Sequence, residues 1–393
     1  MDVRLSEQQR ELQEAARRFA QGELVELARD IEANDSSLPP EMIRRYGELG
    51  FLGVNLPERY GGLGLGHLEA LLVLEEFAKI SNAVAFPVFE ALVGPVRPIE
   101  RFGSDELKAA IIPQVTAGEA TVAVSMSEPD AGTALTDLTT RASDHGDHYL
   151  LSGSKRWTRG AGHSRYYVTY CRLSDAPDDA QGAKGIGAVL VDKEWPGVSF
   201  GKREELMGFR GIATRDIVFD QVRVPKSHLI VGAGGFGKLM SAFGLERCGN
   251  ATQSLGLAAG ALEQATAYVQ ERKAFGKPIV DFQAVQLRLA EMAMQVEAAR
   301  LLIYRAAANA AHQPDGLPSV LDSSLAKCFA NEIVRSVTAN GMQVMGGYGY
   351  HKDYGMEQRV RDGFAWGIAG GTTDVQKTNI AAALVGRRFD QRR

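Results

Sequence analysis

The stretch TVAVSMSEPDAGT, Thr121–Thr133, decides the fold, because the pattern of the chain changes there. Its apolar and branched residues favour a short strand, and Pro, Asp and Gly then interrupt it. Four more β-rich runs follow, namely HYLLSGSKRW, RYYVTYCRL, GIGAVLVDK and TRDIVFDQVRV, again separated by Gly, Pro and Asp. This pattern predicts an antiparallel β domain over residues 121–231.

The sequence before this stretch has a helical pattern. Apolar residues from Leu5 to Ala20 recur at helical spacing, and Ser6 resembles an N-cap. The runs HLEALLVLEEFAKI and GSDELKAAIIPQV predict further helices, the second with a cap at Ser104. Residues 1–120 are therefore expected to form a helical region.

Helices return after Phe236, and they are long. Residues 238–276 contain no proline, and two more helical runs, FQAVQLRLAEMAMQVEAARLLIYRAAANAA and SVLDSSLAKCFANEIVRSVTANGMQVMGG, follow with short connections. Long helices with short connections predict a helix bundle over residues 232–393.

The composition excludes several classes of protein. The 393 residues are 45% hydrophobic and 23% charged, which is typical of a soluble protein with two or three structural regions. A net charge of -4 gives no reason to expect nucleic-acid binding, and no run of eighteen apolar residues predicts a membrane span. Cys171, Cys248 and Cys328 form no C-x-x-C pair, and the first residues resemble neither a signal peptide nor a transit peptide. We expect a cytoplasmic protein.

Two apparent binding motifs give weak predictions. His145 and His148 lie among Asp and Gly residues, so we interpret them as part of a solvated hairpin turn and expect no metal site. VGAGGFG, Val231–Gly237, matches the dinucleotide fingerprint G-x-G-x-x-G. That fold needs a second parallel strand soon after the helix, whereas helical sequence continues here for about forty residues. We therefore expect a glycine loop that joins two domains.

Six motifs in order along nearly the whole chain resemble those of acyl-CoA dehydrogenases, the flavin enzymes that desaturate acyl thioesters. They are SMSEPDAGT, GSKRWTRGAG, EELMGFRGIATRDIVFDQVRVP, ERKAFGKPIVDFQ, QVMGGYGY and GGTTDVQKTNIA. The resemblance implies an α+β fold with an N-terminal helical domain (1–120), a middle antiparallel, barrel-like β domain (121–231) and a C-terminal four-helix bundle (232–393). It also implies FAD as the cofactor and a homotetramer or homodimer.

The resemblance carries the family's flavin contacts onto this chain. It puts Met126 and Ser127 at the flavin ring and Trp157 beside it, although Trp157 taken alone would suggest core packing. Arg272 lies in the motif that reaches a neighbouring subunit's flavin, and its planar donor fork suits phosphate. The expected cofactor-binding residues are Met126, Ser127, Thr133, Trp157, Thr158, Arg159, Arg272, Ala274, Phe275, Phe282, Gln283, Gln343, Gly346, Gly347, Thr372 and Asp374.

Arg159 departs from the family pattern. The second residue after the tryptophan is usually threonine or serine, whose hydroxyl bonds near flavin N5, but here Thr158 is followed by Arg159. A cation at this place would stabilise a reduced, anionic flavin, turn to solvent, or meet a carboxylate or phosphate of the substrate. The sequence leaves these alternatives open.

The terminal motif GIAGGTTDVQ, Gly367–Gln376, lacks its usual catalytic carboxylate. Gly370 stands at that position and keeps the backbone N–H that stabilises the thioester oxygen in the family. Some branched-chain and long-chain members carry the glutamate on the first long helix of the bundle, in a pattern like L-E-R-x-x-x-A. LERCGNA matches this pattern and makes Glu246 the expected base. Partial desolvation there would raise its pKa and strengthen it as a base.

The same comparison of motifs predicts the substrate contacts. Arg247 resembles the position that contacts the CoA arm, and Thr133, the backbone at Gly244 and Gly370 are further substrate-binding candidates. The family's usual Tyr-Glu pair is Ala369-Gly370 here, which opens the pocket and predicts a branched, cyclic or otherwise bulky acyl group.

Three functional hypotheses remain at the level of sequence. The favoured one is FAD-dependent dehydrogenation of an acyl-CoA, with an electron-transfer flavoprotein as the electron acceptor. The alternatives are a flavin oxidase or monooxygenase on the same fold and a dehydrogenase acting on a carrier-protein thioester. A catalytically inactive version of the fold is disfavoured by the retained flavin motifs.

Overall fold

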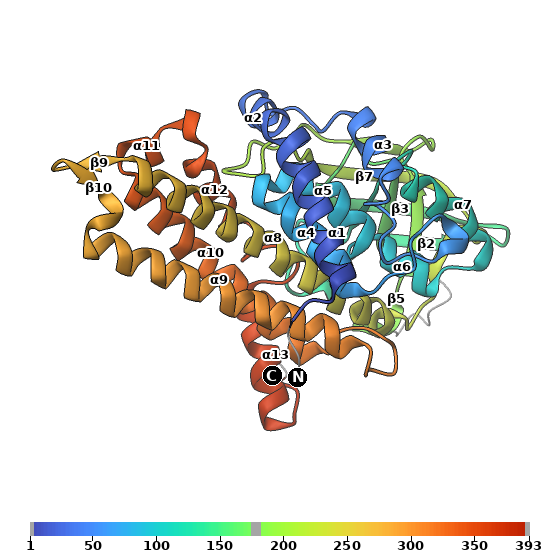
Figure 1. Cartoon of the computed structure of the whole chain (residues 1–393). Coiled ribbons are helices and arrows are strands. Elements are labelled where there is room, and N and C mark those ends of the chain that lie inside the picture. Colours follow the sequence, from blue (N-terminus) through green and yellow to red (C-terminus); the bar gives the residue numbers. More distant parts are fainter. Residues whose placement is uncertain (1–3, 174–181, 390–393) are drawn as a thin grey trace.

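The computed structural model describes residues 4–173 and 182–389 and contains three regions in chain order (Figure 1). Helices form the first region, a twisted sheet forms the second, and long helices form the third. The expected α+β fold class is confirmed. Among the described helices, none combines the length and the apolar character that crossing a membrane requires.

The N-terminal region packs its helices around the aromatic side chains of Phe19, Tyr46 and Phe77. The expected cap at Ser6 is confirmed, because its hydroxyl accepts the Gln9 N–H and the Gln9 side chain accepts the Ser6 N–H. The helices are α1 (Glu7–Phe19), which continues as a π-helical turn (Ala20–Leu24), α2 (Val25–Asn34), α3 (Pro40–Glu48), α4 (His67–Ile80), α5 (Asn82–Leu92), α6 (Val96–Phe102) and α7 (Asp105–Thr116).

The middle region forms an eight-stranded sheet whose main path runs β6-β7-β3-β2-β4-β5-β8, with β1 paired to β4. The strands are β1 (Val122–Ser125), β2 (Arg141–Asp144), β3 (His148–Arg159), β4 (Tyr166–Leu173), β5 (Ile186–Asp192), β6 (Val198–Phe200), β7 (Thr214–Pro225) and β8 (Leu229–Val231). His145 and His148 lie at the β2–β3 hairpin, and the glycine loop after Val231 joins β8 to the next helix, as expected.

One detail of the sheet differs from the antiparallel expectation. β1 and β2 both run parallel to β4 and share one of its edges, β1 along Tyr166–Thr169 and β2 along Arg172–Leu173. The cause is the connection after β3, which carries the chain past β2, so that β4 runs in the direction of β2. The chain leaves this edge between β1 and β2, and the Met126–Ser127 segment lies in that excursion.

The C-terminal region is built on α8 (Phe236–Glu271), which contacts both α4 and α10. A side chain at Gly249 or Gly256 would overlap Val93 or Ala78, so these glycines let α8 lie close to the N-terminal helices. The remaining elements are β9 (Lys273–Ala274), β10 (Lys277–Pro278), α9 (Gln283–Ala310), α10 (Val320–Met345), α11 (Gly347–Tyr350), α12 (Met356–Asp362) and α13 (Thr373–Val385).

The ends of α8 and α9 form an arm with the β9–β10 hairpin at its tip, far from β3 (Figure 1). Phe275, in this hairpin, has 96% of its side chain exposed and a φ of 50°. The deep half of α8, by contrast, is buried among the other helices. One helix therefore carries residues of the molecular interior and of a projecting surface.

Candidate active site

Glu246 lies on the buried part of α8 but keeps part of its side chain exposed, whereas its neighbours Leu245 and Cys248 are buried. Its carboxylate makes no hydrogen bond or ion pair with any other described residue. Burial raises the pKa of Glu246 to about 7, and the positive charges of Arg247, Lys327 and Arg159 oppose that shift. A carboxylate with this pKa and no partner is suited to accept a proton near neutral pH.

The loop that carries Gly370 is fastened by a buried lysine that sequence reasoning missed. Lys327 of α10 donates to the carbonyl oxygens of Trp366 (3.1 Å), Ala369 (2.9 Å) and Gly371. Burial lowers the pKa of Lys327 to about 7. These bonds fix the backbone around Gly370.

A buried amide pair connects this loop to α8. Asn331 Nδ2 donates to the Trp366 carbonyl (2.7 Å) and to Asn250 Oδ1 (2.8 Å). Asn250 lies one turn after Glu246 and donates to the Ala369 carbonyl at 3.4 Å. The only sequence signal for Lys327 and Asn331 is their i, i+4 spacing within an otherwise apolar helix stretch.

Gly370 has a φ of 66°, a left-handed conformation that glycine adopts without strain. Its backbone N–H donates to no acceptor in the described part of the chain. A Cβ at this position would lie 3.1 Å from Asn250 Nδ2, so Asn250 borders the space that the missing side chain leaves. Gly370 thus offers a free backbone donor close to the helix face that carries Glu246.

Arg159 ends β3 and lies against two neighbouring aromatic rings. Its Cζ is 4.3 Å from the ring centroid of Phe209 and 4.5 Å from that of Trp366. Burial lowers the pKa of Arg159 to about 10, whereas the charges of Asp362 and Glu246 raise it. Phe209, Trp366 and Asp362 were not predicted as site residues, because no sequence pattern connects them.

One side chain and one backbone N–H of β3 fasten the segment that contains Met126 and Ser127. Lys155 Nζ donates to the Met126 carbonyl (3.0 Å) and to Glu128 (2.8 Å), and the Arg156 N–H donates to the Ser127 carbonyl (2.9 Å). Burial disfavours ionisation of Glu128, but the charge and hydrogen bonds of Lys155 outweigh it and lower the pKa of Glu128 to about 2. This buried ion pair holds the predicted flavin-contacting segment against β3.

Trp157 projects from the same strand into solvent. The pairing of β3 with β7 is irregular between Lys155 and Thr158, and Trp157 has a φ of 54° with 64% of its side chain exposed. Core packing of Trp157 is therefore excluded, and its ring is free to contact a flat ligand. Thr158 points inward, where its buried hydroxyl has no hydrogen-bond partner.

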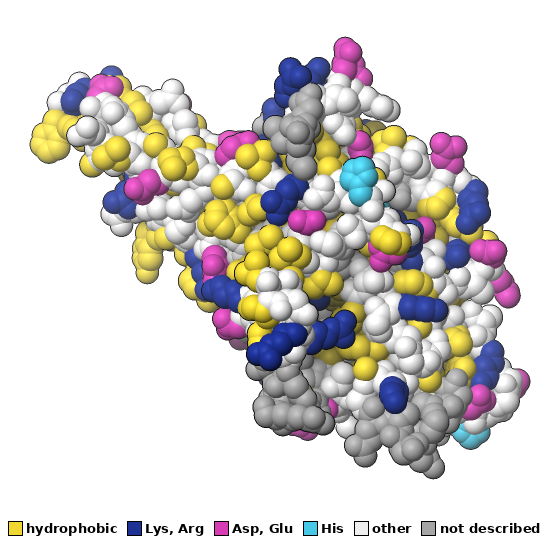
Figure 2. Space-filling view, turned by 90° about the horizontal axis from the view of Figure 1, so that it is seen from below, with side chains coloured by type: hydrophobic (Ala, Val, Ile, Leu, Met, Phe, Trp, Pro, Cys, Tyr) yellow, Lys and Arg dark blue, Asp and Glu magenta, His cyan; other side chains and the backbone are white. Residues whose placement is uncertain are grey.

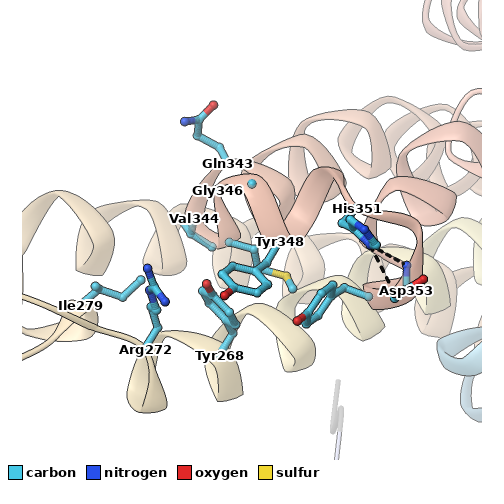
Figure 3. A pocket seen from close by; sticks show the side chains of 12 residues that line it. Tyr268, Arg272, Ile279, Gln343, Val344, Gly346, Tyr348, His351 and Asp353 are labelled. Carbon is cyan, nitrogen blue, oxygen red and sulfur yellow. Dashed lines mark hydrogen bonds and ion pairs between the residues drawn. The ribbon is translucent and has the colours of Figure 1, made fainter.

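A second group of predicted cofactor residues lines a cavity of about 590 Å³ at the arm. Arg272, Gln343, Gly346 and Gly347 border it, and Figure 3 shows Arg272 pointing into the same space as Tyr268. No described atom lies within 4 Å of a Cβ built on either glycine. Aromatic rings, one arginine and open glycine backbone fit an aromatic dinucleotide with charged phosphates.

The remaining predicted residues lie around these two groups. Ala274 and Phe275 belong to the hairpin, where Phe275 contacts Phe282 at 6.0 Å between ring centroids, and Gln283 begins α9. Thr372 caps α13 by accepting the Val375 N–H at 3.2 Å, and Asp374 is exposed in its first turn.

The three predicted CoA contacts differ in their surroundings. Thr133 is exposed in the excursion between β1 and β2. Gly244 is buried on α8 against the Pro318 carbonyl. Arg247 is next to Glu246, and its buried Nε has no hydrogen-bond partner.

Family models for acyl-CoA dehydrogenases match the chain in three blocks, the N-terminal domain over residues 6–119, the middle domain over 123–222 and the C-terminal domain over 233–385. The 3-sulfinopropanoyl-CoA desulfinase of Paraburkholderia xenovorans is 35% identical over 393 residues, which covers 99% of both chains. The caffeyl-CoA reductase-Etf complex subunit CarC of Acetobacterium woodii is 35% identical over 381 residues, covering 97% of this chain and 99% of CarC. The structure of a glutaryl-coenzyme A dehydrogenase glutaryl-CoA complex superposes with a TM-score of 0.93 at 33% identity, covering 99% and 98% of the two chains.

The fold and the site define a flavoprotein oxidoreductase. The chain belongs to the acyl-CoA dehydrogenase family, whose cofactor is FAD.

Proposed function

We propose that this enzyme catalyses the FAD-dependent α,β-dehydrogenation of an acyl-CoA thioester, with Glu246 as the base. The observation that carries the proposal is the unpaired Glu246 carboxylate, whose pKa burial raises to about 7. Glu246 takes the proton from the α carbon, and the electron pair left there forms the new double bond as hydride leaves the β carbon. Met126, Ser127 and Trp157 would hold FAD, which would supply the acceptor for that hydride.

The acidity of the α proton depends on stabilising charge at the thioester oxygen. The Gly370 N–H is a donor with no other acceptor among the described residues, and Lys327 holds the loop in which it lies. A preorganised backbone donor stabilises enolate character without reorganising as the charge develops. We propose that Arg247, beside the base, attracts the negatively charged CoA arm, which would give its unpaired Nε a partner.

The acyl group is proposed to be branched, cyclic or otherwise bulky. The proposal depends on the small side chain of Ala369 and on Gly370, with Asn250 bordering the space between them and α8. The names of the relatives span several acyl groups, so family membership leaves this choice open.

The assembly is proposed to be a homotetramer, with a homodimer as the alternative. The predicted cofactor residues on and beside β3 lie far from those at the arm within one copy of the chain (Figure 1). This arrangement is expected when the arm of one copy completes the site of another. Exposed apolar side chains on α9, Leu287 and Met294, support an interface there, and Figure 2 shows hydrophobic side chains along the arm. The molar mass in solution tests this assignment.

The physiological acceptor is proposed to be an electron-transfer flavoprotein, and the name of CarC as a subunit of an Etf complex supports this choice. Two alternatives remain, a flavin oxidase or monooxygenase and an enzyme for carrier-protein thioesters. Rapid oxygen consumption with no thioester response would favour the first. Turnover of acyl carrier protein but not of the matching acyl-CoA would favour the second.

The deciding experiment mixes the purified FAD-containing enzyme with a panel of acyl-CoAs without oxygen and follows the flavin absorbance. We expect bleaching with at least one thioester, and its loss in Glu246→Gln. Bleaching that is undiminished in this variant would contradict the assignment of the base. Good turnover of straight butyryl or octanoyl thioesters with none of branched or cyclic ones would contradict the proposed bulk of the acyl group.

A further inference from the structure

Two aromatic rings contact the Arg159 guanidinium. The centroids of Phe209 and Trp366 lie 4.3 and 4.5 Å from Cζ and only 5.3 Å from each other, so both buried rings approach the guanidinium from neighbouring directions. A guanidinium stacked on aromatic rings gains cation–π energy and is held in a defined plane.

The edge of the same guanidinium is unoccupied. Arg159 makes no hydrogen bond and no ion pair with any other residue in the described ranges, although it has five N–H donors. The buried indole N–H of Trp366 also has no partner there. Buried polar donors are nearly always paired in folded proteins, so the unpaired Trp366 N–H beside the partly exposed, unpaired Arg159 guanidinium points to a ligand.

The nearby carboxylates do not complete this cluster. Asp362 accepts the Phe209 N–H at 2.6 Å and forms no ion pair with Arg159. Glu246 interacts with Arg159 through its charge alone, and it must stay free to accept a proton. A charge held in an aromatic environment without a counter-ion is costly, and Arg159 therefore lacks the anion that would stabilise it.

The missing anion would lie near the reacting carbons. Trp366 lies four residues before Gly370, in the same loop that Lys327 holds. The positive charge of Arg159 is close enough to Glu246 to lower its pKa. Arg247, the expected contact for CoA, lies on α8 and not in this cluster. The Arg159 edge is therefore assigned to the acyl end of the substrate.

We propose that Arg159 binds an oxyanion at the far end of the acyl chain and selects acyl-CoAs that carry such a group over neutral ones. The planar N–H fork matches the two oxygens of a carboxylate or sulfinate, and the Trp366 indole supplies a further donor. The proposal rests on the proposed dehydrogenase function. It adds the substrate class, and it assigns to Arg159 a role in specificity that the sequence left open.

Binding of such an acyl group would also strengthen the base. The Arg159 charge lowers the pKa of Glu246, and an oxyanion that neutralises this charge removes part of that effect. The carboxylate of Glu246 would then hold a proton more tightly in the presence of the correct substrate than with a neutral analogue.

The test compares length-matched thioesters without oxygen: succinyl-CoA and glutaryl-CoA carry a carboxylate, 3-sulfinopropanoyl-CoA carries a sulfinate, and butyryl-CoA and valeryl-CoA are neutral. Dissociation constants come from the flavin absorbance change, and rates come from bleaching. We expect at least one oxyanion-bearing thioester to bind about 10- to 100-fold more tightly than its neutral partner, as expected for hydrogen bonds between charged groups. A comparison of the carboxylate-bearing with the sulfinate-bearing thioesters shows which oxyanion the enzyme prefers.

The variants Arg159→Met and Arg159→Lys test the residue itself. Arg159→Met should bring the ratio of the dissociation constants of neutral and oxyanion-bearing thioesters close to one. Arg159→Lys keeps the charge without the planar N–H fork and should retain part of the preference. Arg223→Met is the matched control, because Arg223 is exposed on β7 of the same sheet. Flavin content and melting temperature identify variants that do not fold, and the wild-type panel is informative without any variant.

Two results would overturn the inference while leaving the proposed function intact. One is equal binding and bleaching by neutral and oxyanion-bearing thioesters in the wild type. The other is an Arg159→Met variant that slows all substrates by the same factor and shifts the flavin potential, which would assign Arg159 to the cofactor. If no thioester bleaches the flavin, the proposed dehydrogenase function itself fails, and the inference with it.

Discussion

The pH dependence of flavin reduction follows from the surroundings of Glu246. Burial raises its pKa from the ordinary 4.5 to about 7, and only the ionised form accepts the α proton. With this pKa, about one tenth of the molecules carry the active carboxylate at pH 6 and about nine tenths at pH 8. The rate of bleaching should therefore rise about tenfold over this interval and fall as the pH drops below 7.

The assay is anaerobic stopped-flow bleaching with a saturating acyl-CoA from about pH 5.5 to 9, at constant ionic strength. An α-deuterated substrate shows whether proton removal limits the measured step. Glu246→Gln should lower the rate by about 10²- to 10⁴-fold, the usual contribution of a general base, and should abolish the rising limb. Glu291→Gln, an exposed glutamate on α9, is the matched control.

Two other buried groups titrate in the same range and need separate variants. The pKa of Asp362 is also raised to about 7 by burial, so Asp362→Asn should keep the rising limb if Glu246 is the base. The Lys327 charge lowers the pKa of Glu246, so Lys327→Met should move the midpoint to higher pH. A midpoint near pH 5, or a limb that persists in Glu246→Gln, would refute the assignment.

Three further predictions concern the framework of the site. Lys327→Met removes three hydrogen bonds from a charged donor to the loop carbonyls, each of which keeps one other side-chain donor, and should lower the free energy of unfolding by about 3 kcal/mol, measured in urea; a change below about 1 kcal/mol would contradict its role. Trp157→Ala should weaken FAD retention about 3- to 10-fold with little change in melting temperature, because the ring is exposed; unchanged flavin content after ultrafiltration would exclude the contact. Lys155→Met breaks a buried ion pair and should cost about 3–5 kcal/mol. In the wild type, ionised Glu128 stabilises the fold above its ordinary pKa of 4.5, and this contribution is lost as the pH falls toward 2; the variant lacks the Lys155 charge that lowers this pKa, so its urea midpoint should lose most of that dependence on pH.

Local signals in the sequence predicted the elements well. The caps at Ser6 and Ser104 are present, and apolar periodicity separated the helical regions from the strands. The parallel pairing of β1 and β2 with β4 was not predictable, because strand order depends on contacts between distant segments and not on the periodicity of any one strand.

The site was predictable only where a motif marked it. The pattern around Glu246 located a carboxylate on α8, but the pattern could not show that its carboxylate is unpaired. The sequence gives no sign that Lys327 is more than an ordinary helix residue, because its acceptors at Trp366 and Gly371 come close only in the folded chain. Arg159 was recognised as a departure, whereas its aromatic neighbours come from residues 209 and 366, which only the fold brings together.

The Glu128 carboxylate closes the excursion between β1 and β2 at both ends. It lies at the start of the loop, next to the Ser127 segment, and accepts the backbone N–H groups of Thr139 (2.6 Å) and Thr140 (2.9 Å) at its end. Changing the length of a loop whose ends are already joined costs little free energy. Substitutions, deletions or insertions among the exposed residues between these ends, which include Thr133, should therefore leave the predicted flavin-contacting segment in place. The Glu128 carboxylate thus separates a loop that tolerates change from a segment that does not.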